Sequence, residues 1–182
     1  MKKIFLLLAL SPFLLAMQCG EDDSPCGKFI EFEKPDLVTI ENQQTTYSVG
    51  DVLWLSASVD RIQTNPVTNS TYDLFQSDEK LLYYVDFRKA SNYNGYYQLY
   101  LNENTTVVEH GEINWNNIIL VKSGEQFKSK IGIKLLEPGS YTLYFYNVAS
   151  YNPERMGCNF TVYSMISNFD GMDGGMFSFE VE

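Results

Sequence analysis

Hydrophobic and polar residues alternate with a period of two along several segments of this chain. The clearest is FKSKIGIKLL, residues 127–136. One face carries Phe127, Ser129, Ile131, Ile133 and Leu135, and the other carries Lys128, Lys130 and Lys134. Such alternation predicts a half-buried strand with one face in water.

Other segments repeat this pattern, with apolar faces at 53–59, 81–87, 97–101, 141–145 and 177–181. Residues 117–122 are apolar on both faces, which predicts a covered strand. Residues 28–33 or 36–41 supply the first strand, and residues 158–165 supply one near the end. Gly50-Asp51 predicts a turn, and so does EPGS at residues 137–140, which we expect to close a hairpin between the strands on either side.

We find no 11-residue window with a helical stripe, and expect eight to ten short strands in about 155 residues. This pattern predicts an all-β fold, an antiparallel β-sandwich of the immunoglobulin-like Greek-key kind. A closed β-barrel is the alternative. Trp54 lies opposite Leu53 and Leu55, so it belongs to the core only if that strand is covered on both sides.

The first residues have a different character. Lys2 and Lys3 precede an apolar segment from Ile4 to Met17, which is shorter than the roughly 20 residues of a membrane-spanning helix. This is the pattern of a secretory signal. The segment leads to Cys19, and the acidic stretch GEDD follows at residues 20–23.

Residues 1–23 resemble a bacterial lipoprotein signal, and the acidic stretch resembles the export tag of surface lipoproteins in Bacteroidota-type cells. The resemblance implies cleavage before Cys19, lipid attachment at Cys19 and an outer-membrane, cell-surface location. At least two acyl chains would then provide stable anchoring. We expect a signal peptide at 1–18, an acidic tether at 19–27 and a single domain at 28–182. A secreted soluble protein, or a Cys19 buried in the core, is the alternative.

Cys26 and Cys158 remain if Cys19 carries lipid. In an oxidising compartment an even pair is usually bridged, which predicts a Cys26–Cys158 disulfide. The closed loop is long, so the chain-entropy model gives it on the order of 4 kcal/mol of stabilisation. Two buried free thiols are the alternative.

The chain has 13 basic and 23 acidic residues. Removal of Lys2 and Lys3 leaves 11 against 23, a net charge near −12 for the mature protein. Nucleic-acid partners require a positive patch and are therefore excluded, and any membrane link must be the covalent lipid.

Few residues offer catalytic chemistry, and we expect no enzyme, no cofactor and no metal. The single histidine, His110, lies at an expected turn without a nucleophile elbow and is interpreted as a surface residue. The segment NFDGMDGG at 168–175 places Asp170 and Asp173 among glycines, where calcium binding and a plain turn both remain open.

Aromatic residues are abundant, with 13 Tyr and 12 Phe. Alternation places four tyrosines on the faces opposite the apolar ones: Tyr96, Tyr100, Tyr144 and Tyr146. Exposed tyrosines can stack on sugar rings or anchor a protein. We expect a non-catalytic interaction or structural module of the envelope, with a glycan-binding module that uses these tyrosines as the alternative. An unknown envelope protein or a glycan is the expected partner.

Overall fold

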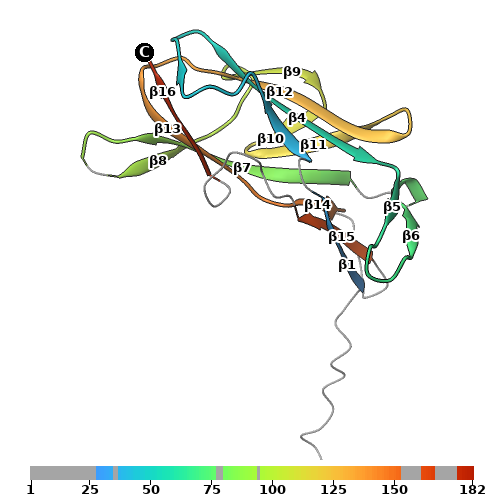
Figure 1. The fold of residues 1–182 in the computed structure, drawn as a ribbon. Coiled ribbons are helices and arrows are strands. Elements are labelled where there is room, and N and C mark those ends of the chain that lie inside the picture. The colour runs from blue at the N-terminus through green and yellow to red at the C-terminus, as the bar shows by residue number, and fades with distance from the viewer. Residues whose placement is uncertain (1–27, 35–36, 77–79, 94, 153–160, 167–175) are drawn as a thin grey trace, which may run out of the picture.

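The structure is a computed structural model that describes residues 28–34, 37–76, 80–93, 95–152, 161–166 and 176–182. Within these residues the fold is all-β, with one short 3-10 turn (Figure 1). The elements are β1 (Lys28–Glu33), β2 (Val38–Glu41), β3 (Thr46–Tyr47), β4 (Val52–Asp60), β5 (Ile62–Thr64), β6 (Thr71–Asp73), η1 (Leu74–Gln76), β7 (Lys80–Ala90), β8 (Tyr96–Leu99), β9 (Thr106–His110), β10 (Glu112–Asn114), β11 (Asn117–Ser123), β12 (Gln126–Lys134), β13 (Gly139–Phe145), β14 (Val148–Tyr151), β15 (Thr161–Ile166) and β16 (Met176–Val181).

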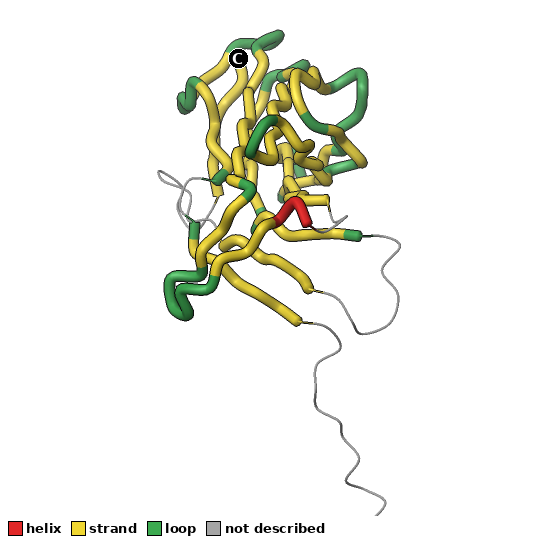
Figure 2. The backbone as a smooth tube through the Cα atoms, turned by 90° about the vertical axis from the view of Figure 1, so that its right-hand side faces the viewer, coloured by secondary structure: helices red, strands yellow, loops and turns green. Residues whose placement is uncertain are grey.

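Fourteen of these strands belong to one curled sheet, and β5 and β6 form a separate pair. The main path runs β1-β15-β14-β7-β11-β12-β4-β2. The sheet curls so that its inner faces enclose the core (Figure 2). The expected antiparallel pairing is found except for β1 with β15 and β16 with β3, which are parallel. The sheet is therefore mixed, and its strand order does not establish an immunoglobulin-like Greek key.

The predicted inward faces are buried in β4, β7, β12 and β16. Their apolar residues belong to one hydrophobic cluster, which extends from Ile30 to Val181. Alternation predicted these faces because each strand has one face in the core and one in water.

Four expectations were wrong in detail. The described residues contain sixteen strands, some only two to four residues long, rather than eight to ten. Strand β11 is not covered on both faces, because Ile119 and Val121 are only partly buried. In β8, Tyr97 remains 45% exposed although it shares the face of Leu101.

The expected hairpin across residues 137–140 is the fourth error. Strand β13 pairs with β7 and β16, and β12 pairs with β4, β9 and β11. Beyond β12, Leu135 exchanges backbone hydrogen bonds with the turn before β4, from Gly50 N to Leu135 O (2.7 Å) and from Leu135 N to Asp51 O (2.9 Å). The chain then enters β13, which does not pair with β12. Pro138 and Gly139 therefore belong to a connection between two strands that do not pair with each other rather than to a tight hairpin turn.

Trp54 is partly buried on the outer face of β4. It stands opposite Gly132 on β12, and a Cβ at Gly132 would lie 3.1 Å from the indole. The Lys130 ammonium lies 5.2 Å from the ring centroid on the same outer face. The indole therefore covers the space that glycine leaves open.

Several sequence-based predictions lie outside the described residues. They concern Cys19, Cys26, Cys158, Asp170 and Asp173. Among the residues that are described, no helix has the length and apolar character needed to cross a bilayer.

Candidate functional site

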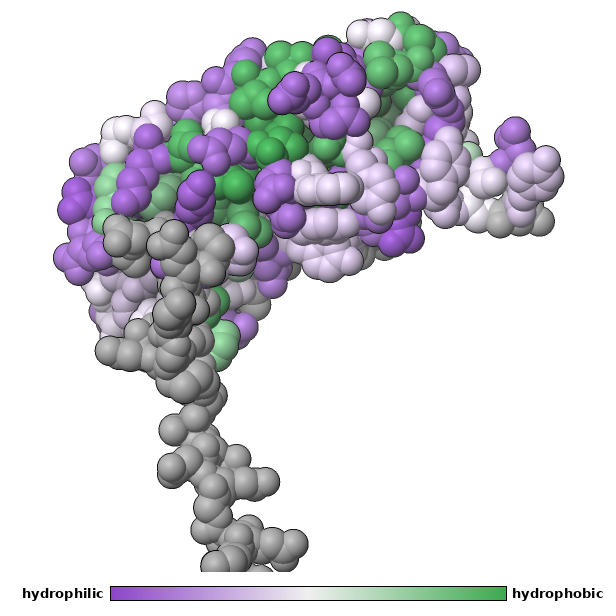
Figure 3. All heavy atoms as spheres, turned by 180° about the vertical axis from the view of Figure 1, so that it is seen from behind, coloured by the Kyte–Doolittle hydropathy of each residue, from purple (hydrophilic) through white to green (hydrophobic). Residues whose placement is uncertain are grey.

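The outer face of β7, β8 and β13 gathers aromatic and polar side chains. Gln98 on β8 stands opposite Arg88 on β7, and Tyr144 on β13 stands opposite Asp86 on β7. Because side chains on adjacent strands in register point to the same side, Tyr96, Gln98, Asp86, Arg88 and Tyr144 share this face. The hairpin that carries β8 projects from the body of the molecule (Figure 3).

The structure places the four predicted tyrosines at three separate positions. Tyr144 is half-buried and packs edge-to-face on Tyr146, with ring centroids 4.9 Å apart. Tyr146 also contacts Tyr84, with centroids 5.4 Å apart. Tyr100 instead lies against Trp115, at 5.7 Å and 87°. Tyr96, near the tip of the hairpin, is 54% exposed.

A hydrogen-bond network joins side chains of β7 and β8. Arg88 donates to both carboxylate oxygens of Asp86, with Nε to Oδ1 at 2.9 Å. Gln98 donates to the Tyr84 hydroxyl and, at 3.4 Å, to Asp86 Oδ1. Asp86 is buried whereas the Arg88 side chain is 52% exposed. The network therefore fixes the polar groups of this face and leaves the guanidinium in contact with solvent.

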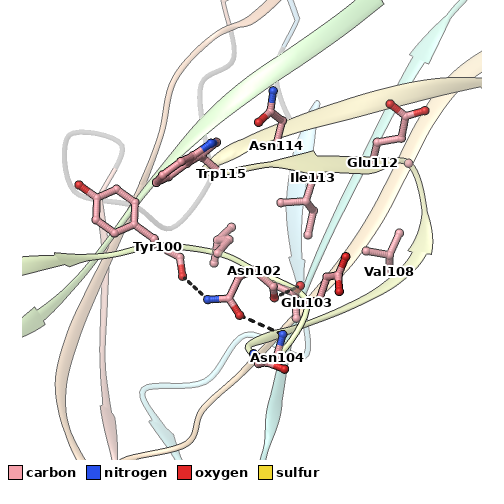
Figure 4. A pocket seen from close by; sticks show the side chains of 12 residues that line it. Tyr100, Asn102, Glu103, Asn104, Val108, Glu112, Ile113, Asn114 and Trp115 are labelled. Atoms are coloured by element: carbon pink, nitrogen blue, oxygen red, sulfur yellow. Dashed lines mark hydrogen bonds between the residues drawn. The ribbon is translucent and has the colours of Figure 1, made fainter.

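Beside Tyr100 lies a groove with a volume of about 860 Å³. It is formed by residues 100–104, the strands β9 and β10, and the turn after β10 (Figure 4). Tyr100 and Trp115 stand together at one end, and Val108 and Glu112 lie toward the other. Its polar side chains are Asn102, Asn104, Asn114, Thr106, Glu103 and Glu112, and its apolar ones are Leu101, Val108 and Ile113.

Trp115 is presented by an unusual turn. Asn114 pairs with Asn117, so Trp115 and Asn116 form a two-residue hairpin loop. Such loops favour positive φ, usually in Gly or Asn. Trp115 has a φ of 53°, a strained conformation for a bulky residue, and it is 69% exposed.

Asn116 holds this turn in place. It is 1% exposed, and its Oδ1 accepts a hydrogen bond from the Leu101 backbone N–H at 3.0 Å. Its Nδ2 donates to the carbonyls of Val85 and Leu99, both at 2.9 Å. One amide thus joins the β10–β11 turn to β7 and to the segment after β8, which fixes the positions of both Trp115 and Tyr100.

The opposite wall is held by local hydrogen bonds. Asn102 Oδ1 accepts from the backbone N–H groups of Asn104 (2.9 Å) and Thr105 (3.2 Å), and the Thr106 hydroxyl donates to the Asn102 carbonyl at 2.6 Å. Lys134 Nζ donates to the Asn104 carbonyl at 3.2 Å. Both walls of the groove are therefore fixed by the protein itself before any ligand arrives.

The described residues contain no group of three His, Cys, Asp or Glu side chains that could hold a metal ion. His110 ends β9 and is exposed, with Nδ1 3.3 Å from the neighbouring Glu109 carbonyl. The Glu112 carboxylate lies 3.3 Å from Lys80 Nζ, and both side chains are more than half exposed.

Comparison with known proteins gives no match: neither a protein family, nor a curated protein, nor a solved structure is similar to this chain.

Sequence reasoning missed Trp115, Asn116, Tyr84 and the Asp86–Arg88 pair. The available signal was the segment INWNN, residues 113–117, where a tryptophan stands between asparagines at the join of two strands. A large aromatic residue in such a turn is unusual, because turns favour Gly, Asn and Asp. The partners of Asn116 come from distant parts of the chain, so sequence alone does not indicate its role.

Proposed function

We propose that this chain is a lipid-anchored protein of the cell envelope whose β domain binds a neutral glycan. The glycan would lie in the groove rimmed by Tyr100 and Trp115. The sequence favours an interaction module over an enzyme, and the geometry of the groove favours the glycan among the possible partners.

The single observation that carries this proposal is Trp115. An indole that is 69% exposed contributes little to the core, yet the chain adopts a strained φ to place it there. Tyr100, which is 56% exposed, lies beside it. Rigid aromatic rings offer a large apolar surface with a polar edge, which suits the C–H faces of a sugar.

The remaining groove residues suit the hydroxyl groups of a sugar. Asn102, Asn104 and Asn114 carry amides, each of which can donate and accept hydrogen bonds. A hydroxyl also donates and accepts, so the two groups are complementary. The volume of about 860 Å³ falls in the usual range for ligand sites, which supports binding of a short oligosaccharide.

Charge favours a neutral ligand over an acidic one. Glu103 and Glu112 line the groove and are both exposed. The whole chain has a net charge of −10. An acidic polysaccharide would be repelled by both the local and the overall charge.

The test is affinity electrophoresis through gels cast with neutral or with acidic polysaccharides. The sample is a soluble form that starts at Ser24 and so retains every described strand. Retardation by at least one neutral polysaccharide is expected, with at least about a tenfold loss of affinity in Trp115→Ala and in Tyr100→Ala.

Tyr93→Ala is the matched control, because Tyr93 is 93% exposed and does not line the groove. It should migrate like the parent protein. Absence of retardation on a broad neutral panel would reject the glycan and favour a protein partner, to be sought by cross-linking on intact cells.

A further inference from the structure

A second cavity, of about 240 Å³, shares Tyr100 and Leu101 with the glycan groove. Its walls are mainly apolar and include Phe87 from β7, Leu99 from β8 and Leu135 from the segment that connects β12 to β13. Two cations line it, Lys89 and Lys134, together with a single carboxylate, Glu137. In a strongly acidic protein, this cavity therefore has a local excess of positive charge.

Lys89 is partly buried, and most of its side chain is covered. Its side chain is only 13% exposed, and its ammonium lies 5.6 Å from the centre of the Tyr141 ring. The stem also passes close to Gly139, where a Cβ would lie 3.0 Å from Lys89 Cε. Both the ring and the glycine position the ammonium at the cavity.

The charge of Lys89 is balanced by Glu137. Their Nζ and Oε2 atoms are 2.6 Å apart. This hydrogen bond raises the pKa of Lys89 above its ordinary value and lowers the pKa of Glu137 below its own. Both groups are therefore charged at neutral pH.

Another carboxylate can replace that of Glu137 as the partner of Lys89. Its side chain is 68% exposed, so its carboxylate can move into water at little cost in solvation. Its backbone stays fixed, because the Tyr141 hydroxyl donates to the Glu137 carbonyl at 2.8 Å. A second carboxylate that entered the cavity would meet the Lys89 ammonium and an apolar wall.

We propose that this cavity binds a small carboxylate that carries one apolar ring, with the ligand carboxylate replacing Glu137 on Lys89. The size of the cavity limits the ligand to about one ring, because a cavity of about 150 Å³ accommodates benzene and drug-sized ligands need about 300 Å³ or more. The site shares Tyr100 and Leu101 with the glycan groove, but Lys89 and Glu137 line this cavity and not the groove.

Phenylacetate is the probe, and its uncharged isostere phenylacetamide is the matched control ligand. Binding to the soluble form is followed by NMR through the backbone amides of Leu99, Leu101 and Leu135. Phenylacetate should produce saturable shifts at these amides, and phenylacetamide should bind at least about tenfold more weakly.

Two variants, each with a new side chain about as long as the native one, should change the affinity for phenylacetate in opposite directions. Lys89→Met should weaken phenylacetate binding at least about tenfold, and Glu137→Gln should strengthen it about threefold or more because the competing carboxylate is gone. Neither change should alter the binding of phenylacetamide. Trp115→Ala should leave phenylacetate binding unchanged, which separates this site from the glycan groove.

Unshifted amides at saturating phenylacetate, or equal affinities in the parent protein and Glu137→Gln, would overturn the proposal. If Lys89→Met does not fold, Glu137→Gln still decides the question, because a gain in affinity does not arise from unfolding.

Discussion

Asn116 and Trp115 are neighbours in one turn with opposite roles. Asn116 is buried and hydrogen-bonded to three backbone groups, whereas Trp115 is exposed and contacts Tyr100 at the surface. A buried amide that joins three segments stabilises the fold, and an exposed indole beside it contributes mainly to a binding surface. We therefore expect stability and binding to respond to different residues of the same turn.

Asn116→Ala should lower the free energy of unfolding by roughly 2–4 kcal/mol, because it leaves the Leu101 N–H and two carbonyls without this partner. Chemical denaturation measures the change. Asn114→Ala, at an exposed position of the same turn, is the control and should change stability by no more than about 0.5 kcal/mol. Equal losses in the two variants would contradict the role given to Asn116.

At the scale of the strands, the sequence predicted which face of a strand is buried better than it predicted which strands pair. Alternation identified the buried face of β12 and of β16, because each strand contains its own pattern. Pairing depends on residues far apart in the chain, such as β1 with β15 and β7 with β13, and no local pattern reports it. The same reason explains the missed hairpin, since the backbone of Leu135 is bound by the turn at Gly50 and Asp51.

The contact between β12 and β4 at Gly132 gives a second prediction. A Cβ at this position would lie 2.5 Å from Val52 Cγ1 and 3.1 Å from the Trp54 ring. Gly132→Ala should therefore destabilise the protein by about 1–3 kcal/mol, measured by thermal or chemical denaturation.

Val52→Ala removes the nearest of these atoms and serves as the partner variant. The double variant Val52→Ala/Gly132→Ala should be more stable than the sum of the two single changes implies. Strictly additive stability changes would show that the close contact with Val52 is not the cause of the destabilisation by Gly132→Ala.

At the scale of the whole molecule, the first described strand lies at the end opposite β9, which lines the groove. Strand β1, which follows the proposed acidic tether, lies at the lower end of Figure 1, whereas β9 lies at the upper end. Of the four tyrosines predicted from the sequence, Tyr100 alone lines the groove, because the groove depends on how the segment after β8 meets β9 and β10 in space.

The anchor is tested by Cys19→Ala in the full chain. Because the acyl chains would be the only membrane link, we expect the variant to move from the membrane fraction to the soluble fraction. Cys26→Ala should stay membrane-bound and is the matched control. Retention of both variants in the membrane fraction would reject the lipid anchor.

The most direct measurement of the central claim uses the fluorescence of Trp115. The chain contains two tryptophans, so Trp54→Phe leaves Trp115 as the only indole. The protein is titrated with an oligosaccharide fragment of the polysaccharide that retards it in the gel. Binding should shift the emission of Trp115 to shorter wavelength, because a bound sugar removes water from the ring. The shift should saturate with the affinity of the glycan. Saturated binding with unchanged Trp115 emission would show that the glycan lies elsewhere and would contradict the account.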